Sequence, residues 1–163
     1  MLLVSDANIF IDLQKLDLLH LFDKLGFTVA TSDFVFAELN ALQQSIIKSL
    51  HIEIYTMDGS ELLLFYQEFQ DNDFKKISYQ DYSIFYFARK YDGEVLSNDK
   101  RLREYAKQQK VSVRGLFFIL DTIIELDLIT QHEMVIKLKL LLKINKRIPQ
   151  NEVDCRIIKW SDK

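Results

Sequence analysis

The sequence predicts an α/β fold in which helices cover both faces of a parallel β-sheet. Short apolar or β-branched runs alternate along the chain with longer segments that have a helical apolar period, and this alternation is typical of βαβ units. Only 4 glycines and 1 proline occur among 163 residues, of which 48% are apolar. The composition therefore indicates one domain with a substantial core and no linker.

The first half of the chain contains three expected strands. Residues 2–5 are an apolar run, residues 27–31 are rich in β-branched side chains, and residues 51–56 alternate between polar and apolar, as strands do. Helical periodicity fills the segments between them, and Gly26 closes one of these segments. The helices expected in this half are 9–16, 18–25, 33–48 and 61–69, and a polar loop follows at 71–76.

The second half begins with an amphipathic helix at 78–91, for which Ser78 is a favoured N-cap. A turn at Asp92-Gly93 leads into a short apolar strand at 94–97. The remaining expected elements are a basic helix at 100–110, a strand at 111–114, and helices at 116–126, 131–144 and about 150–160.

Two acids interrupt apolar helix faces. Asp81 in the expected helix 78–91 shares its face with Ile77 and Phe85, and Glu38 lies in the apolar stripe of the expected helix 33–48. Burial of an unpaired carboxylate is costly, so each acid needs a partner or a polar cavity. The ordinary interpretations stay open, because Ser78-x-x-Asp81 also matches a capping box and Glu38 can reach solvent from the edge of its stripe.

Further acids follow the expected strands. Asp6 comes directly after residues 2–5, Asp99 follows 94–97, and the helix with Glu38 begins just past the second strand. Carboxyl ends of parallel strands meet at one edge of the sheet, where ligands bind. Clustered carboxylates without His or Cys suit a hard cation such as Mg²⁺ or Mn²⁺, and such a site can promote attack of water on a phosphodiester.

At these positions the chain resembles the PIN domain family, in the branch of the VapC-type toxin ribonucleases. The stretches that carry the resemblance are SDANIFID (5–12), SDFVFAEL (32–39), ISYQD (77–81) and LSNDKRL (96–102). It implies a three-layer α/β/α fold around a five-stranded parallel sheet and a Mg²⁺- or Mn²⁺-dependent endoribonuclease. It also implies RNA as substrate, a homodimer and a cognate antitoxin protein as possible partner.

Site residues follow from the resemblance position by position. It implies that the catalytic and metal-binding acids are Asp6, Glu38, Asp81 and Asp99, with Asn8 and Ser97 in support. Asp12 matches the second acid of the opening motif, and its ordinary interpretation is a helix-surface acid. Contacts with the RNA backbone are expected from Lys100, Arg101 and Arg103.

Charge is distributed unevenly along the chain. Residues 1–74 hold 3 basic and 12 acidic side chains, whereas residues 75–163 hold 18 basic and 12 acidic ones. This pattern fits either a solvated helix face or a phosphate-binding rim beside an acidic centre. The chain is longer than a compact toxin of this family because of the helical segment 131–163, which we expect to be part of the same single domain. Three roles are open for this segment: to extend an RNA-binding surface, to support a dimer or to cap the fold.

Cellular location and competing functions complete the expectations. The single Cys155 cannot form an internal disulfide, and we expect no signal peptide or membrane span, so the cytoplasm is predicted. The first alternative is a catalytically silent PIN-like module that binds RNA or protein. The second is a phosphoacceptor receiver domain, for which Asp58 after the third strand is the candidate acceptor.

Overall fold

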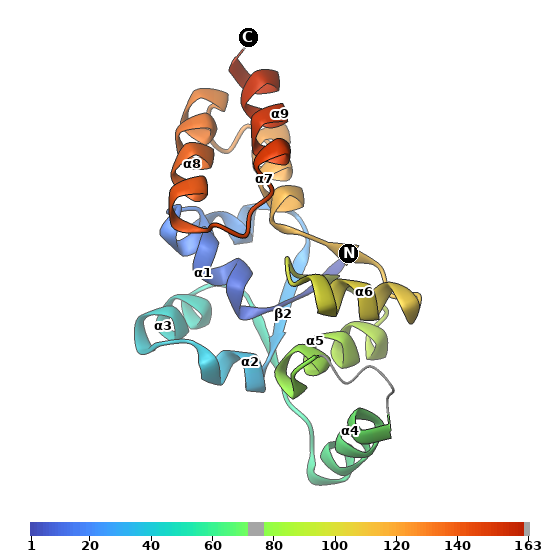
Figure 1. Ribbon diagram of the computed structural model, residues 1–163. Coiled ribbons are helices and arrows are strands. Elements are labelled where there is room, and N and C mark those ends of the chain that lie inside the picture. Colours follow the sequence, from blue (N-terminus) through green and yellow to red (C-terminus); the bar gives the residue numbers. More distant parts are fainter. Residues whose placement is uncertain (72–76, 162–163) are drawn as a thin grey trace.

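The computed structural model describes residues 1–71 and 77–161, and it contains a five-stranded, all-parallel sheet with strand order β3-β2-β1-β4-β5 (Figure 1). The strands are β1 (Leu2–Ser5), β2 (Thr28–Ser32), β3 (Glu53–Tyr55), β4 (Glu94–Leu96) and β5 (Val113–Arg114). The sequence-based prediction of an α/β fold with a parallel sheet is therefore confirmed. The loop expected at 71–76 lies outside the described residues, except for Asp71, which ends a helix.

Helices lie on both faces of the sheet, which gives the three layers that the family resemblance implied. They are α1 (Ala7–Lys15), α2 (Asp33–Glu38), α3 (Ala41–Ser49), α4 (Gly59–Asp71), α5 (Tyr79–Lys90), α6 (Lys100–Gln108), α7 (Leu116–Glu125), α8 (Gln131–Ile144) and α9 (Gln150–Ser161), with a 3₁₀ helix at Leu19–Lys24. Successive strand residues point to opposite faces. Accordingly, Leu3 belongs to the apolar cluster of α1, α7 and α8, and Val4 to that of α5 and α6.

The prediction of one helix over 33–48 is wrong, because the chain breaks between α2 and α3. Leu39 is extended, and Asn40 begins α3 as its N-cap. The Asn40 side chain accepts from the Gln43 backbone N–H at 2.9 Å, while the Gln43 side chain accepts from the Asn40 N–H at 3.0 Å. This capping box satisfies two helix-end donors and sets the new helix start, so Glu38 ends α2 and does not lie inside an apolar stripe.

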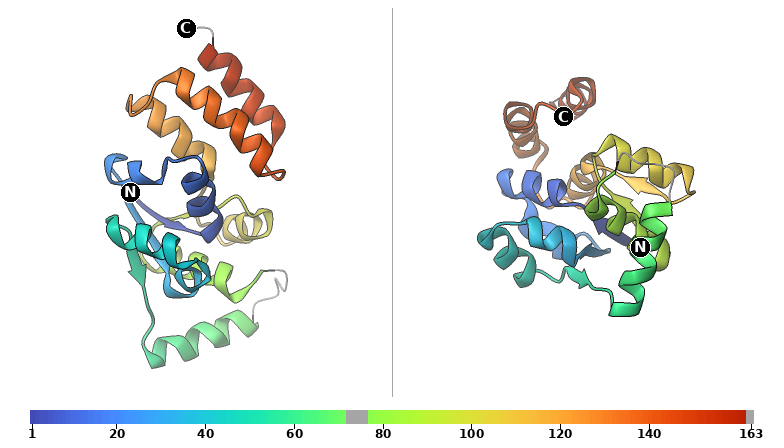
Figure 2. Two further views of the ribbon diagram at one scale, coloured as in Figure 1. Left: turned by 90° about the vertical axis from the view of Figure 1, so that its left-hand side faces the viewer. Right: turned by 60° about the horizontal axis from the view of Figure 1, so that its bottom comes forward.

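The C-terminal helices α8 and α9 form an antiparallel hairpin beside α7, at the end of the molecule opposite α4 (Figures 1 and 2). Buried residues of the hairpin, such as Leu138 and Trp160, belong to the same apolar cluster as Leu3. Arg156 in α9 forms two hydrogen bonds with Asp121 in α7, of 2.8 and 2.6 Å. None of the helices described here is long and apolar enough to cross a membrane.

We predict that the hairpin unfolds together with the sheet. Leu138 is fully buried in α8, so Leu138→Ala should lower the free energy of unfolding by about 2–5 kcal/mol through lost burial and a residual cavity. Denaturant unfolding should show one transition for the parent and one for Leu138→Ala. The matched control is Leu140→Ala on the same helix, where the side chain is 40% exposed and the loss should be clearly smaller. A separate early transition for the hairpin would contradict this prediction.

Candidate active site

Predicted acidic residues converge at the carboxyl ends of the central strands. Asp6 follows β1 directly, and its backbone N–H donates to the Leu96 carbonyl of β4 at 3.1 Å. The register that pairs Ser5 with Leu96 places the ends of β1 and β4 beside each other, so Asp6 and Asp99 approach from neighbouring strands. Helix α2 leaves β2 at the same edge of the sheet, because parallel strands end on the same side.

Asp6 is the buried centre of this group, with 2% of the residue exposed. Its Oδ1 accepts from the Ile9 N–H at 3.1 Å, which makes Asp6 the N-cap of α1. Its Oδ2 accepts from the Ser97 hydroxyl. Burial raises the pKa of Asp6 to about 7; the charges of Asp81 and Asp99 add to that rise, and the two hydrogen bonds oppose it.

Ser97 links two of the acids. Its fully buried hydroxyl donates to Asp6, and the same oxygen accepts from the Asp99 backbone N–H at 2.9 Å. Asp99 is the N-cap of α6, since its Oδ1 accepts from the N–H groups of Arg101 and Leu102, both at 2.9 Å. The turn after β4 is therefore held at both ends, which agrees with a supporting role for Ser97.

Asp81 combines the two interpretations that its sequence position left open. The Ser78 oxygen accepts from the Asp81 N–H at 3.1 Å and caps α5, while the Ser78 hydroxyl donates to Asp81 Oδ2 at 2.9 Å. Burial raises the pKa of the half-buried Asp81 carboxyl, and the charge of Asp99 raises it further against the hydrogen bonds from Ser78. Asp81 thus belongs to the cap and to the acidic group.

Glu38 is the last residue of α2 and is exposed. Partial burial raises the pKa of its carboxyl, and the charge of Asp81 adds to the rise. We call Asp6, Glu38, Asp81 and Asp99 the acidic centre. The charges of Asp6, Asp81 and Asp99 interact with one another, and the charge of Glu38 interacts with that of Asp81.

A buried serine pair, which sequence reasoning missed, connects the elements that carry Glu38 and Asp81. Ser83 in α5 donates from its hydroxyl to Ser32 Oγ at 2.6 Å, and Ser32 caps α2 by accepting from the Val35 N–H at 3.1 Å. Both serines are fully buried. The signal in the sequence was a small polar residue between the large apolar residues of α5.

The donor set fits a hard divalent cation in chemistry, because it consists of carboxylate oxygens whose mutual repulsion a cation would relieve. Within residues 1–71 and 77–161, however, no three Asp, Glu, His or Cys side chains stand together so that they could hold one metal ion. The acids therefore do not form a closed cage. Mg²⁺ is commonly bound by one or two carboxylates together with water and substrate phosphate, which such an open arrangement permits.

A polar groove of about 1130 Å³ borders the acidic centre at Asp99. It lies between α1, the start of α6 and the connection from α8 to α9, and all three predicted RNA-contacting residues line it, as does Asn8. Lys100 also pairs with Glu104 at 3.8 Å. The structure thus brings the predicted basic residues of α6 to a surface next to the acids.

The interpretation of Asp12 as a surface acid is wrong. Asp12 is only 5% exposed, and its Oδ2 accepts from the Asn145 amide at 2.7 Å. Burial raises the pKa of Asp12, while Asn145 and the charge of Lys15 oppose the rise. The residue therefore connects α1 to the end of α8, and Asn145 is a site-bordering residue that sequence reasoning missed.

The family model DUF3368, described as a PIN domain, matches residues 2–161 of this chain. The chain belongs to the PIN domain family. PIN domains are typically nucleases, and the acidic centre lies in this PIN domain where the four motif stretches meet.

No curated protein matches the chain. Among solved structures, the PIN domain is similar to a PilT N-terminus domain protein, SSO1118, from the hyperthermophilic archaeon Sulfolobus solfataricus P2. The two share 8% sequence identity over 78% of this chain and 94% of the other, with a TM-score of 0.41.

We predict that Asp6→Asn stabilises the PIN domain increasingly as the pH rises from about 4 to above 7. The pKa of Asp6 is raised to about 7 by burial, whereas an unfolded Asp titrates near 4. Between these values the folded protein binds more protons than the unfolded chain, so the free energy of unfolding of the parent falls with pH. Asparagine keeps the same shape without the charge.

Thermal melts at pH 4 and pH 8, without divalent cations, measure this difference. The melting temperature of Asp6→Asn should exceed that of the parent by several degrees at pH 8, since about 1 kcal/mol corresponds to roughly 2–4 °C in a domain of this size. The difference should shrink at pH 4. Asp71→Asn, which removes an exposed carboxylate of α4, is the control and should differ from the parent equally at both pH values.

Proposed function

We propose that this PIN domain is a Mg²⁺- or Mn²⁺-dependent endoribonuclease that hydrolyses RNA phosphodiester bonds. The observation that supports this most is the buried Asp6, whose carboxylate is held by Ser97 and surrounded by the charges of Asp81 and Asp99. A protein gains no stability from carboxylates that repel one another at the edge of its sheet. Such a group is understandable where it binds a cation, because perturbed acids gather at functional sites.

The residues have distinct roles in this proposal. Asp6, Asp81 and Asp99 would provide the carboxylates next to a divalent cation that water and substrate phosphate also bind, and Ser97 keeps the Asp6 carboxylate in place. When bound, the cation neutralises charge on the scissile phosphate and lowers the pKa of water at the site. Glu38 would complete the cation's surroundings or orient the attacking water from the end of α2, where burial and the charge of Asp81 raise the pKa of its carboxyl.

Its biological setting is part of the same proposal. The resemblance to VapC-type ribonucleases supports a toxin that a cognate antitoxin protein restrains in the cytoplasm, with the PIN domain as a homodimer. An antitoxin would have to cover the acidic centre or the groove beside it to block cleavage. Size-exclusion chromatography with light scattering of the protein purified from its own cells tests both the partner and the dimer.

The second candidate is a catalytically silent PIN-like module that binds RNA or protein. It is favoured by one observation, namely that no three acids in the described part of the chain stand at metal-binding separation. A silent module would bind RNA equally well in EDTA and in Mn²⁺ and would leave the RNA intact.

We predict that purified protein cleaves a mixed pool of structured RNA with Mn²⁺ but not with EDTA. Asp99→Asn should slow cleavage about 100-fold or more, because metal-ion catalysis contributes several kcal/mol and about 1.4 kcal/mol corresponds to tenfold. Gel analysis of end-labelled RNA measures the rate. Asp71→Asn serves as the matched control and should cleave at the parent rate. Cleavage by Asp99→Asn at the parent rate would reject the assignment of Asp99.

A further inference from the structure

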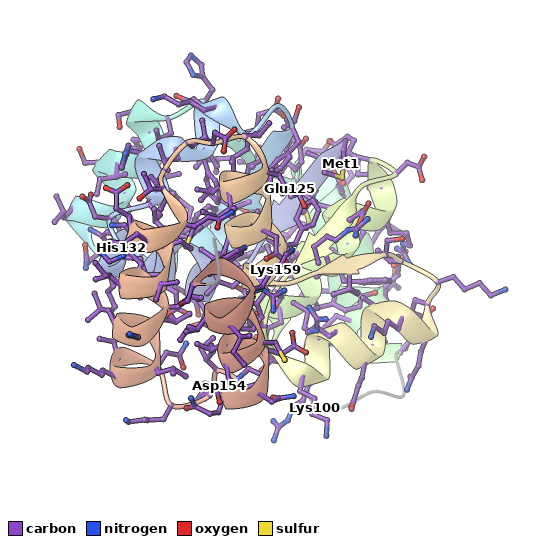
Figure 3. The ribbon with its side chains drawn as sticks, turned by 90° about the horizontal axis from the view of Figure 1, so that it is seen from above. Met1, Lys100, Glu125, His132, Asp154 and Lys159 are labelled. Carbon is purple, nitrogen blue, oxygen red and sulfur yellow. The ribbon has the colours of Figure 1, made fainter. Side chains whose placement is uncertain are left out.

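The groove beside Asp99 has the C-terminal hairpin as one of its walls. Asn145, Arg147 and Pro149, in the connection from α8 to α9, line it opposite Asn98 and the start of α6. Figure 1 shows this connection crossing the lower end of the hairpin next to α1, and Figure 3 shows Lys100 of α6 on the same side of the molecule as Asp154 of α9. The hairpin therefore contributes to the surface next to the acidic centre.

Cationic side chains outnumber acidic ones in the lining of the groove. Lys15, Lys100, Arg101, Arg103 and Arg147 face three acids, namely Asp12, Asp99 and Glu152. Of these acids, Glu152 is paired with Arg156 at 2.8 Å, and Asp12 accepts a hydrogen bond from the neutral Asn145 amide at 2.7 Å. Among the cations, Lys100 also pairs with Glu104 at 3.8 Å. The excess of cations in the groove therefore attracts a polyanion. This attraction opposes the repulsion between the polyanion and the acidic centre.

Arg147 is held in this wall by Asn145. The Asn145 amide donates to the buried Asp12 of α1, and its Oδ1 accepts from the Arg147 backbone N–H at 3.0 Å. The start of the connection is thereby fixed to the sheet-covering layer. The Arg147 guanidinium itself has no hydrogen-bond or ion-pair partner among residues 1–71 and 77–161, and its donors are available to a ligand.

Arg103 is held on the opposite wall. Its Nη1 donates to the Ser97 carbonyl at 2.8 Å, at the turn that also carries Asp99. Gly115 makes room for it, because a Cβ at that position would lie 3.0 Å from Arg103 Nη1 and 2.9 Å from Asn98 Oδ1. A guanidinium is thus fixed at the turn that carries Asp99, on the wall of the groove formed by the start of α6.

We propose that this groove binds the sugar–phosphate backbone of a single-stranded RNA next to the cleaved bond, with Arg147 contacting it from the hairpin and Arg103 from α6. The proposal rests on the proposed ribonuclease function and assigns to the C-terminal hairpin a part in substrate binding. Single-stranded RNA fits because a basic groove that follows the backbone is how proteins bind it. A volume of about 1130 Å³ also exceeds that of most small-molecule pockets.

The test measures RNA binding separately from cleavage. Fluorescence anisotropy of a labelled single-stranded RNA would be recorded at several salt concentrations without divalent cations, on an Asp6→Asn background. We expect Arg147→Ala to weaken binding about 3- to 10-fold and to reduce the salt slope of log Kd by about 0.7, the value for one phosphate contact on a single strand. Arg147→Glu should weaken binding further, and Arg147→Lys should restore most of it.

Lys139→Ala is the matched control, because it removes one exposed cation of the same hairpin that does not line the groove. It should bind RNA as the parent does. In the cleavage assay on the otherwise unchanged chain, Arg147→Ala should raise KM and leave kcat near the parent value. Equal circular-dichroism melts would show that the variants are folded.

Each outcome separates this proposal from the proposed ribonuclease. Cleavage with unchanged RNA affinity in Arg147→Glu would overturn the groove assignment and leave the ribonuclease intact. Arg147-dependent binding without any cleavage would support the groove and overturn the ribonuclease. If Arg147 variants bound RNA normally but lost a co-purifying acidic protein, the groove would be a protein-binding site and the proposal would be wrong.

Discussion

The burial of one carboxylate at the end of the central strand is the constraint on which the rest of the site depends. Asp6 lies between β1 and α1, where its side chain caps the helix and receives the Ser97 hydroxyl. Removing a carboxylate from water raises its pKa and destabilises the folded state at neutral pH unless a cation compensates. The charges of Asp81 and Asp99 raise the pKa of Asp6 further. The arrangement therefore lowers folding stability at neutral pH and is suited to cation binding.

Helix capping is the means by which the fold keeps these acids in place. Three helix starts have a side chain that accepts from backbone N–H groups, namely Asp6 in α1, Asp99 in α6 and Ser78 in α5. The same caps therefore fix the positions of Asp6, Asp99 and Asp81 in the acidic centre. The Ser32–Ser83 pair then links α2 to α5 inside the apolar layer. The same side chain can therefore cap a helix and belong to the acidic centre, as Asp6 and Asp99 do.

The C-terminal hairpin does more than cover the sheet. Its buried side chains complete the apolar cluster around Leu3, while its connection reaches the groove beside Asp99. Asn145 joins both functions, because it ends α8, compensates the buried Asp12 and positions the backbone of Arg147. In the ribonuclease we propose, the extension beyond the motif-bearing part of the chain would thus influence how substrate binds, while all four residues of the acidic centre come from the preceding part.

The sequence by itself determined the fold class and most of the acidic centre, because both depend on local patterns. Strand and helix periodicities differ, and an acid directly after a strand lies at the sheet edge whatever the rest of the chain does. The break at Asn40 was also readable, since Asn40 and Gln43 have the spacing of a capping box, yet the apolar stripe of the expected longer helix concealed it.

Only the tertiary structure decided the environment of Asp12 and the walls of the groove. Asp12 and its partner Asn145 are separated by 133 positions in the sequence, and the helical pattern of α1 alone equally allows a solvated acid. Likewise, the contacts of Ser97 with Asp6 and of Ser83 with Ser32 depend on how strands and helices pack. Burial and hydrogen bonding between distant segments are properties of packing, and packing rather than residue type determines which carboxylates receive hydrogen bonds from distant side chains.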